Sequence, residues 1–167
     1  MNETHPQEKQ SVFTVYVDST IPSYLVSKPS RVPRRSEWQR ITREFWNDKR
    51  FEFVLSDLVI TEVSIGDRTQ VVDRLKAIEG LPVVDVLDLE RSLAQQLIIG
   101  KAIPEVALAD VVRVAGTAIQ AIPYLATWNF AHLANPHTIP KIEQICREAG
   151  YSPPRIASPK AILDELS

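Results

Sequence analysis

Acidic and amide side chains recur in this chain where predicted strands end. Asp18 directly follows the apolar run Val-Tyr-Val, and Asn129 closes the run Tyr-Leu-Ala-Thr-Trp. Glu62 and Asp110 follow the runs Leu-Val-Ile-Thr and Ala-Leu-Ala. In an open parallel α/β sheet, the carboxyl ends of the strands and the helix starts beside them face one crevice. Three carboxylates gathered there repel one another unless a cation lies between them, and oxygen ligands of this kind suit Mg²⁺ or Mn²⁺. The predicted chemistry is that of a metal-dependent phosphodiesterase.

Asp18 and Asp110 are the leading candidates for direct metal ligands. An acidic residue just after a buried strand has few structural reasons to be there, and the alternative for Asp18 is a plain helix cap. Asp110 lies in an otherwise apolar helical run, where burying an unpaired charge would cost several kcal/mol. Arg113, three residues later, offers the alternative of a salt bridge across one helical turn.

The other candidate site residues have supporting roles. Glu62 is expected to complete the acidic cluster, either as a metal ligand or by orienting an attacking water, and the alternative is an exposed helix position. Asn129 brings no charge, so a second metal would be held weakly there. The hydroxyls of Thr127, Ser19 and Thr20 are expected to hydrogen-bond the site carboxylates, or else to cap helices.

The elements that must position these residues alternate along the chain. β-Branched and aromatic runs predict strands at residues 12–17, 51–55, 81–87, 124–128 and 155–157. Helical patterns fall at residues 36–48, near Glu62, and at 69–78, 88–99, 105–121, 138–149 and from Pro159. Alternating strands and helices with short links give a parallel sheet with right-handed crossovers. The predicted class is therefore α/β.

Several of these segments resemble the PIN-domain family, and most closely its VapC-type toxins from type II toxin–antitoxin systems. The resemblance covers the chain from about Phe13 to the last helix. It rests on the opening Asp-Ser-Thr-Ile-Pro-Ser-Tyr-Leu that begins at Asp18, on Glu62 and Asp110, and on Thr-Trp-Asn-Phe with the following His-Leu-Ala-Asn. This resemblance implies a three-layer α/β/α fold with a parallel five-stranded sheet in the order 3-2-1-4-5.

The same resemblance implies a function. PIN-like toxins are metal-dependent endoribonucleases, so Mg²⁺ or Mn²⁺ held by Asp18, Asp110 and Glu62 would promote attack of water on an RNA phosphodiester. A cognate antitoxin protein and a second copy of the chain are the implied partners. Many relatives carry aspartate where this chain has Asn129, and often histidine where it has Arg113. The alternative is therefore a catalytically weak or inactive PIN-like module that acts by binding protein or RNA.

Composition agrees with a small globular protein. The 167 residues, 44% hydrophobic and 24% charged, are expected to form a flexible tail at residues 1–10 and a single PIN-like domain at residues 11–167. The single cysteine, Cys146, excludes an internal disulfide and is expected to be an apolar helix residue. The polar N-terminus and the lack of a long apolar stretch predict a cytoplasmic protein with no membrane contact.

Positive charge is concentrated in one part of the chain. Residues 28–50 hold eight basic and three acidic residues, a net charge of +5, whereas the remainder has a net charge of −7. Such a segment could hold a phosphate backbone near the metal, with Arg31, Arg34 and Arg35 as candidate RNA contacts. The alternative is a solvated helix face.

Aromatic residues leave two further choices open. The stripe Trp38, Ile41, Phe45 and Trp46 is expected to be core, with a groove for a partner helix as the alternative. Trp128 is likewise expected to be core or cleft wall rather than a platform for stacking bases. A phosphorelay receiver, which is also an open α/β domain with an acidic pocket, is disfavoured because paired acids after the first strand and a lysine after the last are not evident. The three histidines do not form a convincing set of general bases.

Overall fold

The sheet is fully parallel and has the order β3-β2-β1-β4-β5. The computed structural model describes residues 11–84 and 88–167. Its strands are β1 (Phe13–Val17), β2 (Phe51–Ser56), β3 (Val83–Val84), β4 (Tyr124–Ala126) and β5 (Arg155–Ala157). The predicted α/β class, the parallel sheet and its strand order are confirmed. The predicted tail at residues 1–10 lies outside the described residues.

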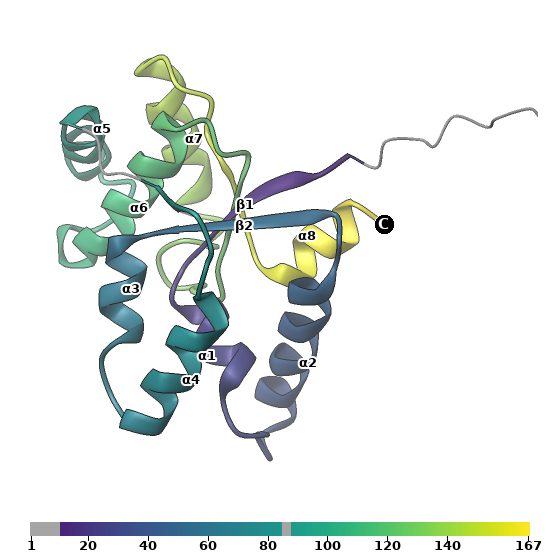
Figure 1. Ribbon diagram of the computed structural model, residues 1–167. Coiled ribbons are helices and arrows are strands. Elements are labelled where there is room, and N and C mark those ends of the chain that lie inside the picture. Colours follow the sequence, from purple (N-terminus) through teal and green to yellow (C-terminus); the bar gives the residue numbers. More distant parts are fainter. Residues whose placement is uncertain (1–10, 85–87) are drawn as a thin grey trace, which may run out of the picture.

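Helices cover both faces of this sheet, giving three layers (Figure 1). One layer holds α1 (Thr20–Val26), α2 (Pro33–Asn47), α3 (Asp57–Val63), α4 (Arg68–Ile78) and α8 (Pro159–Glu165). The other holds α5 (Asp88–Ile99), the short 3₁₀ helix η1 (Glu105–Ala107), α6 (Leu108–Ile119) and α7 (Ile139–Glu148). The side on which the connecting helices lie changes after β3, as the strand order requires for right-handed crossovers.

The strand order fixes where a site can form. From β1 the chain moves outward to β2 and β3, then returns to place β4 on the other side of β1. The strand order therefore reverses between β1 and β4, and the connections diverge outside their carboxyl ends. Asp18 follows β1, and Thr127 and Asn129 follow β4, so the predicted site residues lie at this switch point.

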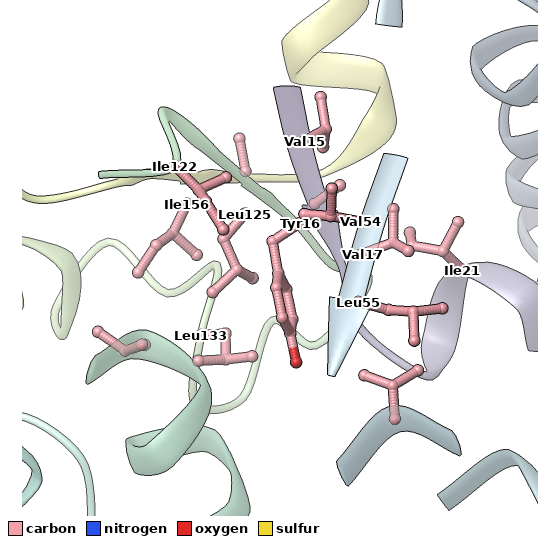
Figure 2. Packing of buried hydrophobic residues seen from close by; sticks show 14 of the residues in the cluster. Val15, Tyr16, Val17, Ile21, Val54, Leu55, Ile122, Leu125, Leu133 and Ile156 are labelled. Atoms are coloured by element: carbon pink, nitrogen blue, oxygen red, sulfur yellow. The ribbon is translucent and has the colours of Figure 1, made fainter. Parts of the chain in front are cut away.

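The core is built on the central strand. Val15, Tyr16 and Val17 of β1 are buried and pack against Leu55 of β2 and Leu125 of β4 (Figure 2). Because successive strand residues point to opposite faces, the two valines face one helical layer and Tyr16 faces the other. The Tyr16 hydroxyl is hydrogen-bonded to Ser56 Oγ at 2.7 Å. The strand that delivers Asp18 is therefore fixed on both faces.

Some expected boundaries were wrong. The long helix expected at residues 105–121 is divided into η1 and α6, because the backbone of Ala107, at φ −100° and ψ 42°, departs from helical geometry. The strand expected at residues 81–87 is described only as Val83–Val84, and residues 85–87 lie outside the described part of the chain. Helix α2 begins at Pro33 rather than Ser36, with proline in the first turn, where its missing N–H is tolerated.

The aromatic residues of α2 belong to the core, as predicted. Ile41 and Phe45 are buried, and Trp46 stacks on Phe53 with 4.6 Å between ring centroids. Trp38 stacks on Trp128 at 4.8 Å with an interplanar angle of 12°. The stripe on α2 is therefore covered by this chain itself and is not an open groove.

Candidate functional site

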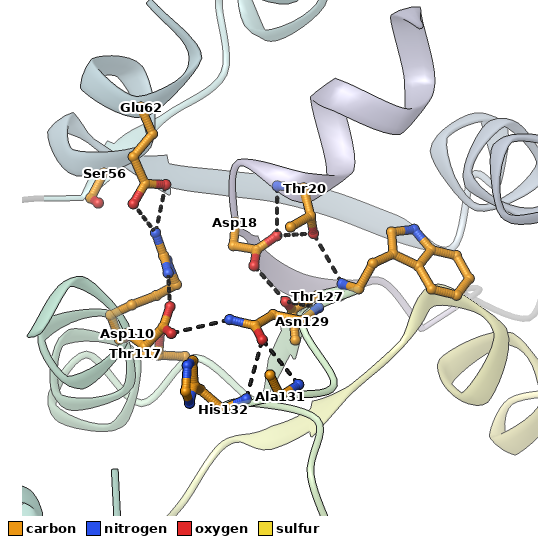
Figure 3. Close-up of polar contacts among 12 residues, drawn as sticks. Asp18, Thr20, Ser56, Glu62, Asp110, Thr117, Thr127, Asn129, Ala131 and His132 are labelled. Carbon is orange, nitrogen blue, oxygen red and sulfur yellow. Dashed lines mark hydrogen bonds and ion pairs between the residues drawn. The ribbon is translucent and has the colours of Figure 1, made fainter. Parts of the chain in front are cut away.

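Asp18 is a buried carboxylate held by the start of α1 and the end of β4. It is 2% exposed. Its Oδ1 accepts hydrogen bonds from the Thr20 backbone N–H at 3.0 Å and from the Thr20 hydroxyl, and Oδ2 accepts one from the Thr127 hydroxyl. Both oxygens therefore have a fixed direction before any ligand arrives (Figure 3).

The two threonines also tie the polypeptide together. Thr127 Oγ1 accepts from the Asn129 N–H at 2.9 Å, and Thr20 Oγ1 accepts from the Trp128 N–H at 2.9 Å. Each hydroxyl therefore donates to Asp18 and accepts from the segment after β4. The predicted roles of Thr20 and Thr127 as carboxylate partners match this geometry. Ser19 makes no side-chain hydrogen bond within the described residues, although its backbone carbonyl accepts from Ser23.

Asp110 and Glu62 are joined by one arginine. Arg113 Nη1 lies 2.6 Å from Asp110 Oδ1, and Nη2 lies 2.8 and 2.7 Å from the two carboxylate oxygens of Glu62. Arg113 is 4% exposed, so this is a buried bridge between α6 and α3. The salt bridge between Arg113 and Asp110, the alternative for Asp110, is therefore present in the structure. Arg113 supplies a positive charge where a metal ion was expected.

Asn129 connects Asp110 to the Asp18 side of the site. Its Nδ2 donates to Asp110 Oδ2 at 3.1 Å, while its backbone N–H binds Thr127. Its Oδ1 accepts from the backbone N–H groups of Ala131 and His132 at 3.2 and 3.1 Å. The amide therefore orients Asp110 and fixes the turn after β4. An ionised aspartate could accept the same backbone bonds but could not donate to Asp110.

Charge in the site is not balanced. Burial raises the pKa of Asp18 above its ordinary value, while Arg113 and the two threonine hydroxyls act in the opposite direction. Burial likewise raises the pKa of Asp110, opposed first by Arg113 and then by His132. The pKa of Arg113 is raised by its acidic neighbours, of which Asp18 acts most strongly, so the guanidinium stays charged. One arginine serves three carboxylates, which leaves a net demand for positive charge.

A small cavity lies behind Arg113. Its volume is about 20 Å³, and Tyr16, Ser56, Glu90, Arg113 and Gly116 are among its lining residues. Arg113 Nε has no hydrogen-bond acceptor within the described residues and is buried. The Glu90 carboxylate is buried too, and a Cβ added at Gly116 would come within 3.1 Å of Glu90 Oε1. Gly116 therefore leaves room for a third buried acid beside Asp18 and Asp110, which the sequence analysis did not single out.

A divalent cation fits part of this arrangement. No three His, Cys, Asp or Glu side chains within residues 11–84 and 88–167 are grouped so that they could hold a metal ion. Glu62 in particular gives both oxygens to Arg113. Asp18 and Asp110, however, are oxygen donors, and the one cation between the acids, Arg113, forms its ion pairs with Asp110 and Glu62 but not with Asp18. Mg²⁺ is commonly held by one or two carboxylates with waters and substrate phosphate. The donor chemistry thus fits a two-carboxylate site, and a role for Glu62 as direct ligand stays a prediction.

His132 lies beside Asp110, although sequence reasoning assigned it no role (Figure 3). The ring is half-buried, and its backbone N–H is fixed by Asn129. The signal was available in the spacing, since His132 follows Asn129 by three residues and so lies on the same turn. An imidazole ring therefore lies beside the acidic site.

The predicted RNA contacts lie on a neighbouring surface. Arg31, Arg34 and Arg35 are exposed at the start of α2, and the Arg34 guanidinium lies 5.1 Å from the ring centroid of Trp38. Trp128, on which Trp38 stacks, is 5% exposed and donates from Nε1 to Thr42 Oγ1 at 2.9 Å. The core prediction for Trp128 is confirmed. Through this stack, the basic segment is joined to the chain segment that carries Asn129.

Comparison with known proteins identifies no family. No protein-family model matches this sequence, and no curated protein is similar enough to be matched to it. Within the described residues, none of the helices has both the length and the apolar character needed to cross a membrane.

Proposed function

We propose that this protein is a metal-dependent endoribonuclease of the PIN-like type. The single observation that carries the proposal is the position of two buried carboxylates at the switch point of the sheet. Asp18 directly follows β1, and Asp110 of α6 is hydrogen-bonded to Asn129, which follows β4. Ligands of open α/β sheets bind at such switch points. Buried carboxylates with raised pKa values in that position indicate a functional site rather than a purely structural one.

The chain's own residues have separate roles in this proposal. Asp18 and Asp110 would hold Mg²⁺ or Mn²⁺, which when bound compensates phosphate charge and lowers the pKa of a water. Thr20 and Thr127 fix the Asp18 carboxylate, and Asn129 fixes that of Asp110. Because these hydrogen bonds already orient the carboxylates, no free energy is needed to reorganise them during the reaction.

Arg113, Glu62 and His132 would act around these two carboxylates. Glu62 holds the guanidinium of Arg113 with both oxygens and so keeps a positive charge against Asp110. This charge reduces the repulsion between the acids. His132, at the outer side of Asp110, is placed to exchange a proton with a leaving oxygen.

The test is cleavage of a mixed single-stranded RNA pool by purified protein in Mn²⁺ and in EDTA. Asp18→Asn and Asp110→Asn are the site variants. Asp164→Asn is a matched control, because Asp164 forms an exposed ion pair with Lys160 on α8. Cleavage that needs Mn²⁺, disappears in both site variants and persists in the control supports the proposal. A folded wild-type protein that cuts no RNA, and whose melting temperature Mn²⁺ does not raise, contradicts it.

The Arg113 bridge favours a second candidate function. A buried guanidinium already compensates part of the acidic charge, so the fold can persist without a metal. In this alternative the protein is an inactive PIN-like module that acts by binding RNA or protein. The melting temperature separates the two, because only the nuclease predicts a marked stabilisation by Mn²⁺.

The proposed toxin role adds partners and a location. We propose a cognate antitoxin and a homodimer, both in the cytoplasm. Support comes from three large apolar side chains that are exposed on α5, η1 and α6, namely Ile99, Val106 and Leu108. Exposed apolar side chains that form a patch often mark protein contacts. Light scattering across a range of protein concentrations tests the dimer, and Val106→Glu should weaken it. A monomer at all concentrations contradicts the homodimer.

A further inference from the structure

A large aromatic ring is exposed beside the acidic site. Phe130 directly follows Asn129, whose side chain binds Asp110 at 3.1 Å, and the phenylalanine is 43% exposed. Consecutive Cα atoms are 3.8 Å apart, so the ring begins one residue from the site. Exposure of such a ring to water is unfavourable by itself. Its exposed part is available to a ligand that binds beside the acidic site.

The ring is supported from behind. Its centroid lies 5.5 Å from that of Trp38 and 6.2 Å from that of Trp128, with interplanar angles of 50° and 62°. The two tryptophans stack on each other, and Trp128 is anchored by Thr42. The Phe130 backbone N–H also donates to the Trp128 carbonyl at 3.1 Å. Because these contacts already restrict the Phe130 ring, little conformational entropy is lost when a ligand stacks on it.

Positive charges lie next to the same ring cluster. Arg34 contacts the Trp38 ring, and Arg35 and Lys28 line a hollow of about 300 Å³ between α1 and the start of α2. Within the described part of the chain, neither Lys28 nor Arg35 forms an ion pair. These cations are therefore free to neutralise charge on a ligand. A chain of contacts therefore links the acidic site to positive charge. Asn129 binds Asp110, the next residue, Phe130, contacts the Trp38 ring, and Arg34 lies over that ring.

We propose that Phe130 stacks against an unpaired base of single-stranded RNA next to the phosphate at the acidic site, and that Arg34, Arg35 and Lys28 contact neighbouring phosphates. Aromatic rings beside basic residues are the usual means of binding single strands, because every base offers a stacking face. A duplex keeps its bases stacked inside and cannot present one to Phe130. The inference rests on the proposed function and assigns base stacking to one residue of this chain, Phe130.

Binding measured without cleavage tests the platform. The probe is a fluorescent single-stranded RNA, and the readout is its anisotropy with wild-type protein in EDTA at fixed salt. Phe130→Ala should weaken binding roughly 5-fold to 100-fold, the range expected for loss of one stacked base. Phe130→Tyr should retain binding because it keeps the ring. Val12→Ala is the surface control. Val12 is 51% exposed and directly precedes β1, so it lies at the amino-terminal end of the strands, whereas the acidic site lies at their carboxyl ends.

A second probe isolates stacking from charge. RNA of the same length that lacks its bases but keeps its phosphates should bind wild type more weakly than normal RNA, whereas Phe130→Ala should bind both equally. Arg34→Ala and Arg35→Ala should instead reduce the dependence of affinity on salt, because each removes a phosphate contact. Equal binding of the two RNAs by wild type would overturn the stacking role.

The outcomes keep this inference apart from the proposed function. RNA that binds in EDTA with a strong dependence on Phe130, yet is never cut in Mn²⁺, supports the platform and contradicts the nuclease. RNA that is cut in Mn²⁺ and binds Phe130→Ala as well as wild type supports the nuclease and overturns the platform. No binding of single-stranded RNA by wild type also overturns it. Circular dichroism of Phe130→Ala, compared with Phe130→Tyr, verifies that any loss is not unfolding.

Discussion

The guanidinium of Arg113 binds both carboxylate oxygens of Glu62, at 2.8 and 2.7 Å, across 51 residues of sequence. The same group reaches Asp110 at 2.6 Å. Arginine suits this position because its planar fork can serve two carboxylates at once, which lysine cannot do. The acidic site therefore contains its own cation, and metal binding must be understood in competition with it.

Replacing this cation should destabilise the protein. Arg113→Gln leaves Glu62 and Asp110 without their partner, and breaking a buried pair in this way typically lowers the free energy of unfolding by about 3–5 kcal/mol. Urea unfolding in EDTA measures the loss. Glu62→Gln in the Arg113→Gln background should cost far less than Glu62→Gln alone, because the partner is already gone. Strictly additive effects of the two changes would contradict the bridge.

The same variant should respond more strongly to Mn²⁺. Without the guanidinium, the carboxylates repel one another more and attract a divalent cation more. We therefore expect Mn²⁺ to raise the melting temperature of Arg113→Gln by more than it raises that of wild type. Mn²⁺ titrations followed by thermal unfolding provide the measurement. An equal rise in both proteins would mean that Arg113 does not compete with the metal.

Stability should depend on pH through Asp18. Burial raises the pKa of Asp18 in the folded protein above its ordinary value, so the folded state holds this proton more tightly than the unfolded state does. Stability is then greatest below the ordinary carboxyl pKa and falls as pH rises through the raised one. Asp18→Asn cannot ionise, so its stability relative to wild type should increase over that range.

Urea midpoints in EDTA between about pH 4 and pH 8 test this dependence. Asp164→Asn is the control, because its carboxylate is exposed and paired with Lys160. Its curve should run parallel to that of wild type. If the urea midpoints of Asp18→Asn also changed with pH in parallel with those of wild type, burial of the Asp18 charge would not destabilise the folded protein, and the prediction would be wrong.

The hydroxyl of Thr127 should contribute more to the stability of the protein than its methyl group does. Thr127 donates to Asp18 and accepts from the Asn129 backbone N–H, so both partners lose a bond in Thr127→Val. Each buried group left unsatisfied costs about 1–3 kcal/mol. Thr127→Ser keeps the hydroxyl and should retain most of the stability and any RNA cleavage. Similar behaviour of the valine and serine variants would show that the hydroxyl is dispensable.

Cys146 should be unreactive in the folded protein. Its side chain is buried on α7, and burial raises the pKa of the thiol to about 11. Because the thiolate is the reactive form, alkylation at neutral pH should be slow in the native state and fast in urea. Mass spectrometry after iodoacetamide treatment measures the two rates. Rapid native labelling would mean that α7 opens readily.

Much of the fold could be predicted because local patterns and tertiary packing agree. The β-branched and aromatic strand β1 and the alternation of elements specify one architecture, although Pro33 did not reveal that α2 begins there. The break at Ala107 had no such signal. Residues 105–109 contain no glycine or proline and favour a continuous helix, so tertiary contacts decide the change from η1 to α6.

The site was predictable to the extent that it depends on strand ends. Asp18, Thr127 and Asn129 meet because parallel neighbours end at one edge, which is a consequence of topology. The pairing of Arg113 with Glu62 was not predictable, because sequence spacing indicates only the partner one helical turn away, Asp110. Glu90 was missed for a related reason, since its neighbours come from across the fold. His132 could have been found, because it follows Asn129 by three residues.

The position of β4 beside β1 also determines when the site can exist. Asp18 is made early in translation, but the hydroxyl and amide that complete its surroundings belong to Thr127 and Asn129. Until the ribosome has passed these residues, β1 has no β4 to pair with. Asp18 then also lacks its hydrogen bond from Thr127. A nascent chain therefore cannot assemble the acidic site until most of the protein has been made. If the proposed nuclease activity is present, the message being read is exposed to it only after that point.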